Sequence, residues 1–159
     1  MIRDSTEDDL DAVMDLIEEV AQEGRWIATE AGFDREARRT RFKAGLSDPK
    51  RGSFVADAGG RVVGSSGIEQ DAPAVPASFG MMVAKDWRGR GIGIALLEAC
   101  IEWARSVGAH KMTLEVWPHN DAALSLYRKF GFVQEGYFTK HYRRRDGELW
   151  DSITMGLML

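Results

Sequence analysis

The residues best suited to binding chemistry lie in a glycine-rich segment at residues 86–97, where Gly89, Gly91 and Gly93 occupy every second position. Closely spaced glycines let the backbone turn tightly and approach a ligand, because no β-carbon stands in the way. Consecutive amides can then point into one concavity and bind an anion. A helix that begins here adds unpaired N–H groups and the positive end of its dipole. The segment therefore predicts a site for a diphosphate.

The spacing of these glycines separates three kinds of phosphate-binding turn. A dinucleotide-binding fingerprint needs Gly-x-Gly-x-x-Gly, and its third glycine is missing here, while a P-loop needs Gly-Lys followed by Ser or Thr. The pattern that fits is Arg-x-x-Gly-x-Gly, formed by Arg88, Gly91 and Gly93. Arg88 and Arg90 are expected to add positive charge at the rim. A glycine-rich helix start that binds no ligand is the alternative interpretation.

A second motif occupies residues 120–132, where Asn-x-x-Ala-x-x-x-Tyr is followed by Gly-Phe. Its Ala123, Tyr127 and Phe130 fall on one face of a helix. Together the two motifs resemble the coenzyme A signature and the closing motif of the GNAT superfamily of N-acetyltransferases. In that family the glycine turn follows a central strand and opens a long helix. The resemblance covers roughly residues 79–135.

The resemblance implies how acetyl-coenzyme A would be bound. The amides of the glycine turn would hold its pyrophosphate, and a strand containing Met82 and Val83 would pair with the pantetheine arm. In the family this strand carries a bulge that frees an amide, here expected from Met82 or Val83, and that amide stabilises the oxyanion. The expected cofactor-binding residues are Met81, Met82, Val83, Arg88, Gly89, Arg90, Gly91, Ile92, Gly93, Ile94, Asn120 and Tyr127.

Tyr127 is the general acid that the resemblance implies, because its phenol would protonate the departing thiolate. Without the motif, a core aromatic whose hydroxyl merely finds a partner is the simpler interpretation. Asn120 would contact the pantetheine or align the helix. Cys100 falls on the apolar stripe of the expected long helix and is interpreted as core. Direct attack by the amine is therefore preferred over a route through an acyl-enzyme.

Acetylation of an amine also needs a base, because an alkylammonium group has a pKa near ~10 and must lose a proton before it attacks. Glu115 lies mid-strand beside the cofactor region, and some relatives carry a glutamate at the matching place. Glu69 ends a strand on the expected acceptor side. For each glutamate, a solvated strand residue or a structural ion pair is the alternative. His119 and His141 are weaker candidates.

The acceptor pocket is expected to come from the variable parts of the fold. Trp26 in the first loop and Tyr142 in the last hairpin would line it, together with Glu69. The C-terminal segment 131–151 is similar to relatives that acetylate free amino acids, polyamines or protein N-termini, and it does not choose among them. Arginines of the second helix and of residues 143–145 would favour an amino acid, although solvated charge is the simpler interpretation.

Hydrophobic periodicity and turn signals predict the elements that position these residues. The order indicates a mixed α/β fold in one domain, residues 1–159. The resemblance adds a central, mostly antiparallel twisted sheet that is splayed at the cofactor strand and flanked by about four helices. Helices are expected over residues 6–24, 34–46, 91–107 and 120–130, and strands over 53–57, 62–69, 79–84, 111–117, 136–140 and 152–158.

Composition limits the class of protein. Apolar residues are 44% of the 159 and charged residues 29%, as in ordinary globular domains. The formal net charge of −4 argues against a nucleic-acid partner. The single cysteine forms no internal disulfide or metal cluster and favours a reducing compartment. Neither a signal peptide nor a membrane span is expected. We therefore expect a cytoplasmic protein without a metal or a membrane partner.

The resulting hypothesis is an N-acetyltransferase that moves acetyl from acetyl-coenzyme A to a primary amine. The acceptor would be a small molecule such as an amino acid, or a protein N-terminus. A homodimer is one possible oligomeric state of the protein. A non-catalytic acyl-coenzyme A binding or sensing module is the first alternative, against which Tyr127 argues, since a sensor needs no acid. A nucleotide-binding protein that uses the same glycine turn is the second.

Overall fold

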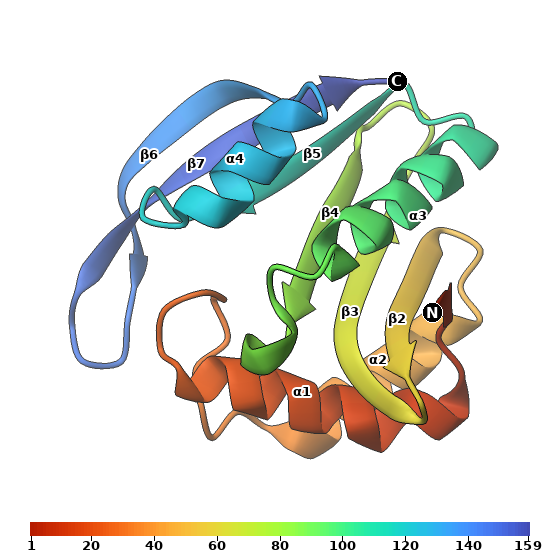
Figure 1. Cartoon of the computed structure of the whole chain (residues 1–159). Coiled ribbons are helices and arrows are strands. Elements are labelled where there is room, and N and C mark those ends of the chain that lie inside the picture. The colour runs from red at the N-terminus through yellow and green to blue at the C-terminus, as the bar shows by residue number, and fades with distance from the viewer.

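A seven-stranded sheet runs through the molecule in the order β1-β2-β3-β4-β5-β7-β6 (Figure 1). All neighbouring strands are antiparallel except β4 and β5, as the expectation of a mostly antiparallel sheet required. In the computed structural model, which describes residues 1–159, the strands are β1 (Ile2–Asp4), β2 (Arg51–Ala58), β3 (Arg61–Glu69), β4 (Ala77–Val83), β5 (Lys111–Val116), β6 (Val133–Arg143) and β7 (Leu149–Met158).

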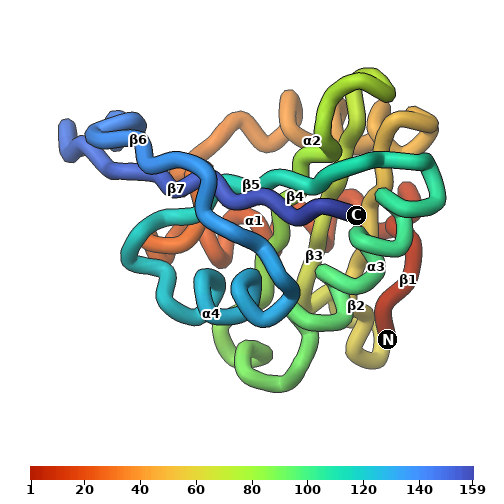
Figure 2. Tube along the Cα trace, turned by 90° about the horizontal axis from the view of Figure 1, so that it is seen from above, coloured from red at the N-terminus to blue at the C-terminus, as the bar shows by residue number.

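Four α-helices cover the sheet from both sides. Figure 2 shows α3 and α4 on one side and α2 on the other. The alternation of β4 gives the reason, because Phe79 packs in the core under α3 and α4 whereas Met82 packs against α1. None of the helices combines the length and apolar character needed to cross a bilayer. The helices are α1 (Leu10–Gln22), α2 (Arg35–Leu46), α3 (Ile92–Ser106) and α4 (Asp121–Lys129), with short 3-10 turns at Glu7–Asp9 and Lys85–Trp87.

The expected capping residues begin these helices. The carboxylate of Asp9 accepts from the Thr6 amide at 2.8 Å, although the first turn after Thr6 is 3-10 rather than α. Asp34 accepts from the Ala37 amide at 3.0 Å and opens α2. Each bond satisfies an N–H group that would otherwise lack a partner at a helix start. The caps therefore fix where α1 and α2 enter the fold.

The sheet is splayed between β4 and β5, as expected. These two strands pair at only two positions, Ala77 with Met112 and Ser78 with Thr113, and then diverge (Figure 1). The expected bulge in β4 is not observed, because its register with β3 is continuous. The gap arises instead from the divergence of the two parallel strands. It leaves one edge of β4 open along residues 81–83.

Strand boundaries differ most from expectation at the two ends of the chain. β1 was not expected, since it has three residues and no apolar alternation. β6 and β7 extend well beyond the expected ranges 136–140 and 152–158, to Val133–Arg143 and Leu149–Met158. Most of β6 is exposed, so composition does not reveal it. Pairing with β7 holds this edge strand in place.

Candidate active site

Two adjoining cavities open where β4 and β5 separate. The glycine groove, about 430 Å³, is lined by the glycine turn, α4 and the edge of β4. The aromatic cleft, about 420 Å³, is lined by the first loop, α2, β5 and the last hairpin. The two cavities form one continuous site because they share residues from four segments. The shared residues are Trp26, Ile27, Met81, Met82, Asn120 and Tyr127.

The glycine turn presents a row of unused backbone donors. Gly89 and Gly91 have φ of 74° and 83°, in the left-handed region that favours glycine. Gly91 caps α3, whose first turn has no internal acceptor for its N–H groups. No protein acceptor exists for the amides of residues 89–94. Because the groove runs along this turn, the geometry is that of an anion site at a helix N-terminus.

The open edge of β4 adds further unused backbone groups. The Ala84 amide donates to β3 at 2.8 Å, and hydrogen-bonded pairs recur at every second residue of an antiparallel ladder. Met82, which pairs with Ser65, therefore directs its amide toward β3. The amides of Met81 and Val83 point the other way, into the gap left by β5. The sequence offered Met82 or Val83 as the donor to an oxyanion, and the ladder favours Val83 and adds Met81.

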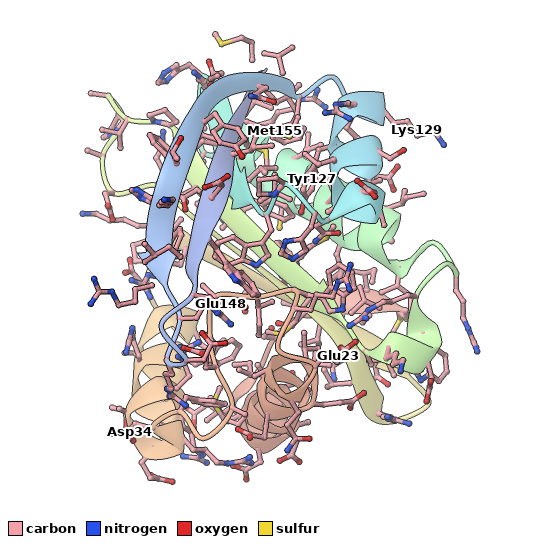
Figure 3. All side chains as sticks on the ribbon, turned by 90° about the vertical axis from the view of Figure 1, so that its left-hand side faces the viewer. Glu23, Asp34, Tyr127, Lys129, Glu148 and Met155 are labelled. Atoms are coloured by element: carbon pink, nitrogen blue, oxygen red, sulfur yellow. The ribbon has the colours of Figure 1, made fainter.

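Arg88 is tied into the protein rather than left at the rim of the groove. Its Nε donates to the Val83 carbonyl at 2.9 Å, and its two Nη atoms donate to the Glu23 carboxylate at 2.9 and 2.6 Å. Figure 3 shows Glu23 at the end of α1, beside the turn that precedes α3. This differs from the expected role as a free charge, because Glu23 neutralises the guanidinium. Arg90 is exposed and lies over the Trp87 ring at 4.7 Å.

Replacing Glu23 with Gln is expected to lower the free energy of unfolding by about 1–2 kcal/mol at pH 7. The hydrogen bond from Arg88 holds the pKa of Glu23 below its usual value. A pKa that is depressed in the folded state contributes stability above the unfolded-state value of ~4.3, and this contribution is lost as the pH falls. Urea unfolding curves of the variant and the native protein should therefore converge below about pH 4.

Glu19→Gln is the matched control for this prediction. Glu19 lies on the same helix, but its side chain is 46% exposed and its ion pair with Arg61 is long, at 3.8 Å. Its replacement should therefore change stability little. A deficit of Glu23→Gln that is equally large at pH 3 and pH 7 would assign the effect to packing rather than to the ion pair.

Tyr127 stands at the junction of the two cavities. Its ring is 6% exposed and packs edge-on against Phe79, with 6.2 Å between ring centres. Burial raises the pKa of its phenol well above the usual value. The hydroxyl makes no hydrogen bond to the protein, yet no fully buried side-chain polar atom lacks a partner. The hydroxyl must therefore reach the cavities, and Figure 3 shows the side chain pointing from α4 into the interior.

Asn120 caps α4, the helix that carries Tyr127. Its Oδ1 accepts from the Ala123 amide at 3.2 Å and so caps the helix. The far end stops at Gly131, whose φ is 93°, as the expected helix terminator requires. Asn120 lines both cavities. The amide group of its side chain therefore has a donor available for a ligand.

Glu115 lies on β5 in the aromatic cleft, held by two hydroxyl groups. Tyr142 donates to its Oε2, and the Ser152 hydroxyl lies 3.4 Å from the same oxygen. The hydrogen bond to Glu115 raises the pKa of Tyr142 to about 12. The other oxygen of Glu115 has no protein partner. A carboxylate in this state can accept a proton from a ligand in the cleft.

A bulge in β6 brings Tyr142 to this carboxylate. The pairing of β6 with β7 shifts between Phe138 and Tyr142, and Lys140 within the shift has a φ of 50°. A bulge of this kind bends its strand and re-aims a side chain. The expected substrate-binding residue Tyr142 is thus placed in the cleft by a local irregularity.

Glu69 lines neither of these two cavities. It lies at the end of β3, where it pairs with Ser78, and it lines a third cavity that meets the aromatic cleft at Phe79 and Gly80. Its carboxylate forms an ion pair with Arg51 at 3.1 Å. Four residues of β4 separate its register from Met82, a span of roughly 13 Å at the rise of a strand. The structure shows the ion pair that the sequence left open as the alternative, whereas a role of Glu69 as a base or an acceptor contact stays a prediction.

The loop between α1 and α2 covers both cavities and is fastened to the last hairpin. Trp26 lines both cavities, and its indole N–H donates to Glu23 at 3.1 Å. Arg144 is 6% exposed, lies 4.3 Å from the Trp150 ring centre, and donates to the Ala28 carbonyl at 3.0 Å. The expected acceptor-side residue Trp26 is therefore held at the wall between the cavities.

Comparison with known proteins decides the family. A model described as the acetyltransferase (GNAT) family matches residues 13–132. The chain belongs to this family. The N-alpha-acetyltransferase RimI of Mycobacterium tuberculosis is 35% identical over 105 residues, which cover 64% of this chain and 65% of that protein. The L-amino acid N-acetyltransferase AaaT of Escherichia coli is 36% identical over 109 residues, again 64% and 65%.

The chain thus spans slightly less than two thirds of the length of these two relatives. The fold comparison covers more. A GNAT superfamily phosphinothricin acetyltransferase from Sinorhizobium meliloti, solved in complex with AcCoA, superposes with a TM-score of 0.87 over 100% of this chain and 88% of that chain, at 21% identity. This likeness shows the GNAT fold.

Within this GNAT site, Cys100 plays no chemical part. It is fully buried on the inner face of α3, and burial raises the pKa of its thiol to about 12. Its Sγ donates to the Ser66 hydroxyl at 3.3 Å. A thiol in this state is not a nucleophile at neutral pH. The structure agrees with the expectation that the cysteine is a core residue.

Two functional contacts were not found from the sequence. Glu23, the partner of Arg88, lies 65 positions away in the chain, and no local pattern joins them. Ser152 is fully buried on β7 and reaches Glu115 only because β5 and β7 are neighbours. The one available signal for Ser152 was a serine at the start of the strand expected over residues 152–158. The first contact depends on how the end of α1 packs beside the turn before α3 and the second on strand order, and the motifs alone fix neither.

Proposed function

We propose that this GNAT protein transfers an acetyl group from acetyl-coenzyme A directly to a primary amine. The observation that carries the proposal is the row of unpaired amides at residues 89–94, which leads along the open edge of β4 to the Tyr127 hydroxyl. The names of RimI and AaaT, both N-acetyltransferases, support it. So does the AcCoA complex of a protein with the same fold.

The glycine groove fits coenzyme A by its donors and by its shape. The amides of residues 89–94 would hold the pyrophosphate, which needs several N–H donors at once. The open edge of β4 would pair with the amides of the pantetheine arm, as an added strand does. Asn120 would donate to the same arm. Arg90, which lies within the glycine turn and over the Trp87 ring, would add positive charge at this end of the groove.

Acetyl-coenzyme A supplies, when bound, a thioester that an amine displaces. Glu115 would take one proton from the incoming ammonium, so that the nitrogen lone pair forms the new C–N bond. One of the two outward-facing β4 amides, that of Met81 or that of Val83, would stabilise negative charge on the carbonyl oxygen. Tyr127 would give its proton to the sulfur as the C–S bond breaks, and the second proton that the attacking nitrogen loses would return to the Tyr127 oxygen. The products are an amide and the free thiol, and the proton taken by Glu115 leaves to solvent.

A mass-spectrometric screen tests the proposal directly. The protein is incubated with acetyl-coenzyme A and a panel of amino acids, polyamines and short peptides, and a mass increase of one acetyl group is expected on at least one of them. In parallel, coenzyme A is expected to raise the melting temperature more than ATP or NAD at equal concentration. Stabilisation by ATP or NAD alone would favour a nucleotide-binding protein and contradict the proposal.

Gly93→Leu is expected to weaken binding of acetyl-coenzyme A by about tenfold or more. A β-carbon at Gly93 would lie 3.5 Å from the end of Met81 and 3.6 Å from Leu126, so a leucine would project into the groove between them. Gly93→Ala is the matched control, because these are ordinary contact distances that a methyl group meets without a clash. Isothermal titration calorimetry of both variants measures the effect, and equal affinities would contradict the assigned path of the cofactor.

The proposal includes the expected domain organisation and the absence of a metal. We take residues 1–159 as one catalytic domain that needs no metal. The homodimer, the cytoplasmic location and the absence of nucleic-acid or membrane partners stay predictions.

A further inference from the structure

Arg38 on α2 differs from every other sheltered arginine of the chain. It is half-buried, and its guanidinium has no carboxylate partner. The remaining arginines that are not exposed each have one: Arg3 with Asp9, Arg35 with Asp15, Arg39 with Asp11, Arg88 with Glu23 and Arg144 with Glu30. A sheltered cation without an anion is costly, so it indicates a charge that the protein itself does not supply.

The guanidinium of Arg38 is held in place at the wall of the aromatic cleft. Its Nη2 donates to the Thr29 hydroxyl at 3.1 Å, and it lies 5.4 Å from the centre of the Phe33 ring. That is its only hydrogen bond, so most of its five N–H donors are available. Burial lowers the pKa of Arg38 from its usual value. A bound anion would offset the desolvation that causes this shift.

The aromatic cleft contains one positive and one negative side chain. Arg38 on α2 and Glu115 on β5 are its only charged residues, and no ion pair joins them. The rest of the wall is largely apolar and aromatic, with Trp26, Phe42 and Trp117 among its residues. A cleft of about 420 Å³ with separated opposite charges complements a small zwitterion that also has an apolar part.

We propose that the acceptor is a free α-amino acid whose carboxylate is bound by Arg38 while its ammonium group faces Glu115. The inference rests on the proposed acetyl transfer and narrows its substrate class. A guanidinium suits a carboxylate because its planar fork matches the two oxygens. A peptide N-terminus lacks this charge, because its first carboxyl group is an amide. The cleft therefore selects free amino acids over protein N-termini.

The first test compares each L-amino acid with its α-carboxamide, using phenylalanine, leucine and methionine as probes with acetyl-coenzyme A. The amide retains the amine and the side chain but lacks the carboxylate charge. Its ammonium group also has a lower pKa, so more of the amide is the neutral nucleophile at pH 7, and this difference works against the expected result. The value of kcat/KM is expected to be at least about tenfold higher for the acid than for the amide. Equal values, or faster acetylation of amides and of short peptides, would overturn the inference.

The second test removes the cation. Arg38→Gln is expected to lower kcat/KM for the preferred amino acid by about tenfold or more, while kcat/KM for its amide changes by less than about threefold. The ratio of kcat/KM for the acid to kcat/KM for the amide is compared between the variant and the native protein. The intrinsic reactivity of each substrate cancels in this comparison, because it is the same with both proteins. Arg35→Gln is the matched control, because Arg35 is one turn away on the same helix, pairs with Asp15 at 2.8 Å and lies outside the cleft. It should leave the ratio unchanged.

Two further measurements separate misfolding and failure of the parent proposal from failure of this inference. Binding of coenzyme A by calorimetry should be the same in native protein and in Arg38→Gln, since Arg38 does not line the glycine groove. If no amine at all is acetylated, the proposed function fails. If polyamines or peptides are acetylated but no free amino acid is, acetyl transfer stands and the role of Arg38 is refuted.

Discussion

Tyr127→Phe is expected to lower kcat for acetyl transfer by roughly 100-fold or more, with little change in the affinity for acetyl-coenzyme A. The variant removes one oxygen atom and keeps the ring that packs against Phe79 and Phe132. The hydroxyl makes no hydrogen bond to the protein, so its loss leaves no buried group unpaired. A defect confined to turnover would therefore reflect proton delivery to the leaving sulfur. Steady-state kinetics and calorimetry measure the two quantities separately.

The electrostatics of Tyr127 add a condition to this result. Because burial raises the pKa of its phenol above the usual value near 10, the phenol stays protonated throughout the neutral and mildly alkaline range. Below about pH 10, no alkaline loss of activity should arise from this residue. Tyr137→Phe is the matched control, because Tyr137 is exposed and bonded to Asp151 on the last hairpin. Native turnover in Tyr127→Phe would remove the phenol from the mechanism.

The fold was predictable from the sequence wherever a short stretch of residues by itself indicates how an element begins, ends or packs. The stripe of α1, the cap at Asp34 and the terminator at Gly131 are local, and the structure confirms each. The splay of the sheet followed from the family resemblance, but its cause did not. It lies in the two-position pairing of β4 with β5, which depends on the distant segments that flank both strands. No window of sequence contains that information.

The site divides in the same way. Its backbone donors were predictable, because glycine spacing controls where amides are exposed, as at Gly89 and Gly91. Its charged side chains were less predictable, since the partner of a charge decides its role. Glu69 and Glu115 are both strand glutamates, yet Glu69 meets Arg51 whereas Glu115 meets two hydroxyl groups in a cleft. Only strand order distinguishes the two environments.

Glu115→Gln is expected to lower kcat/KM at pH 7 by about 100-fold. The substitution keeps the size of the side chain and an acceptor oxygen for Tyr142, but it removes the negative charge. An amide does not take a proton from an ammonium group, so the variant depends on the small fraction of acceptor that is already neutral. As long as the pH is below the amine pKa of ~10, this neutral fraction rises about tenfold for each unit by which the pH increases. The deficit should therefore shrink steadily as the pH rises toward that value.

Two variants distinguish a base from a residue that only positions the substrate. Tyr142→Phe removes one hydrogen bond to Glu115 and keeps the carboxylate, so a smaller loss of about tenfold or less is expected, with the native shape of the pH profile. Glu69→Gln removes an equal charge outside the two cavities and should leave kcat/KM unchanged. A Glu115→Gln profile that runs parallel to the native one at every pH would mean that proton transfer does not limit the reaction. Glu115 would then act by holding the ammonium group, and a water molecule would be the base.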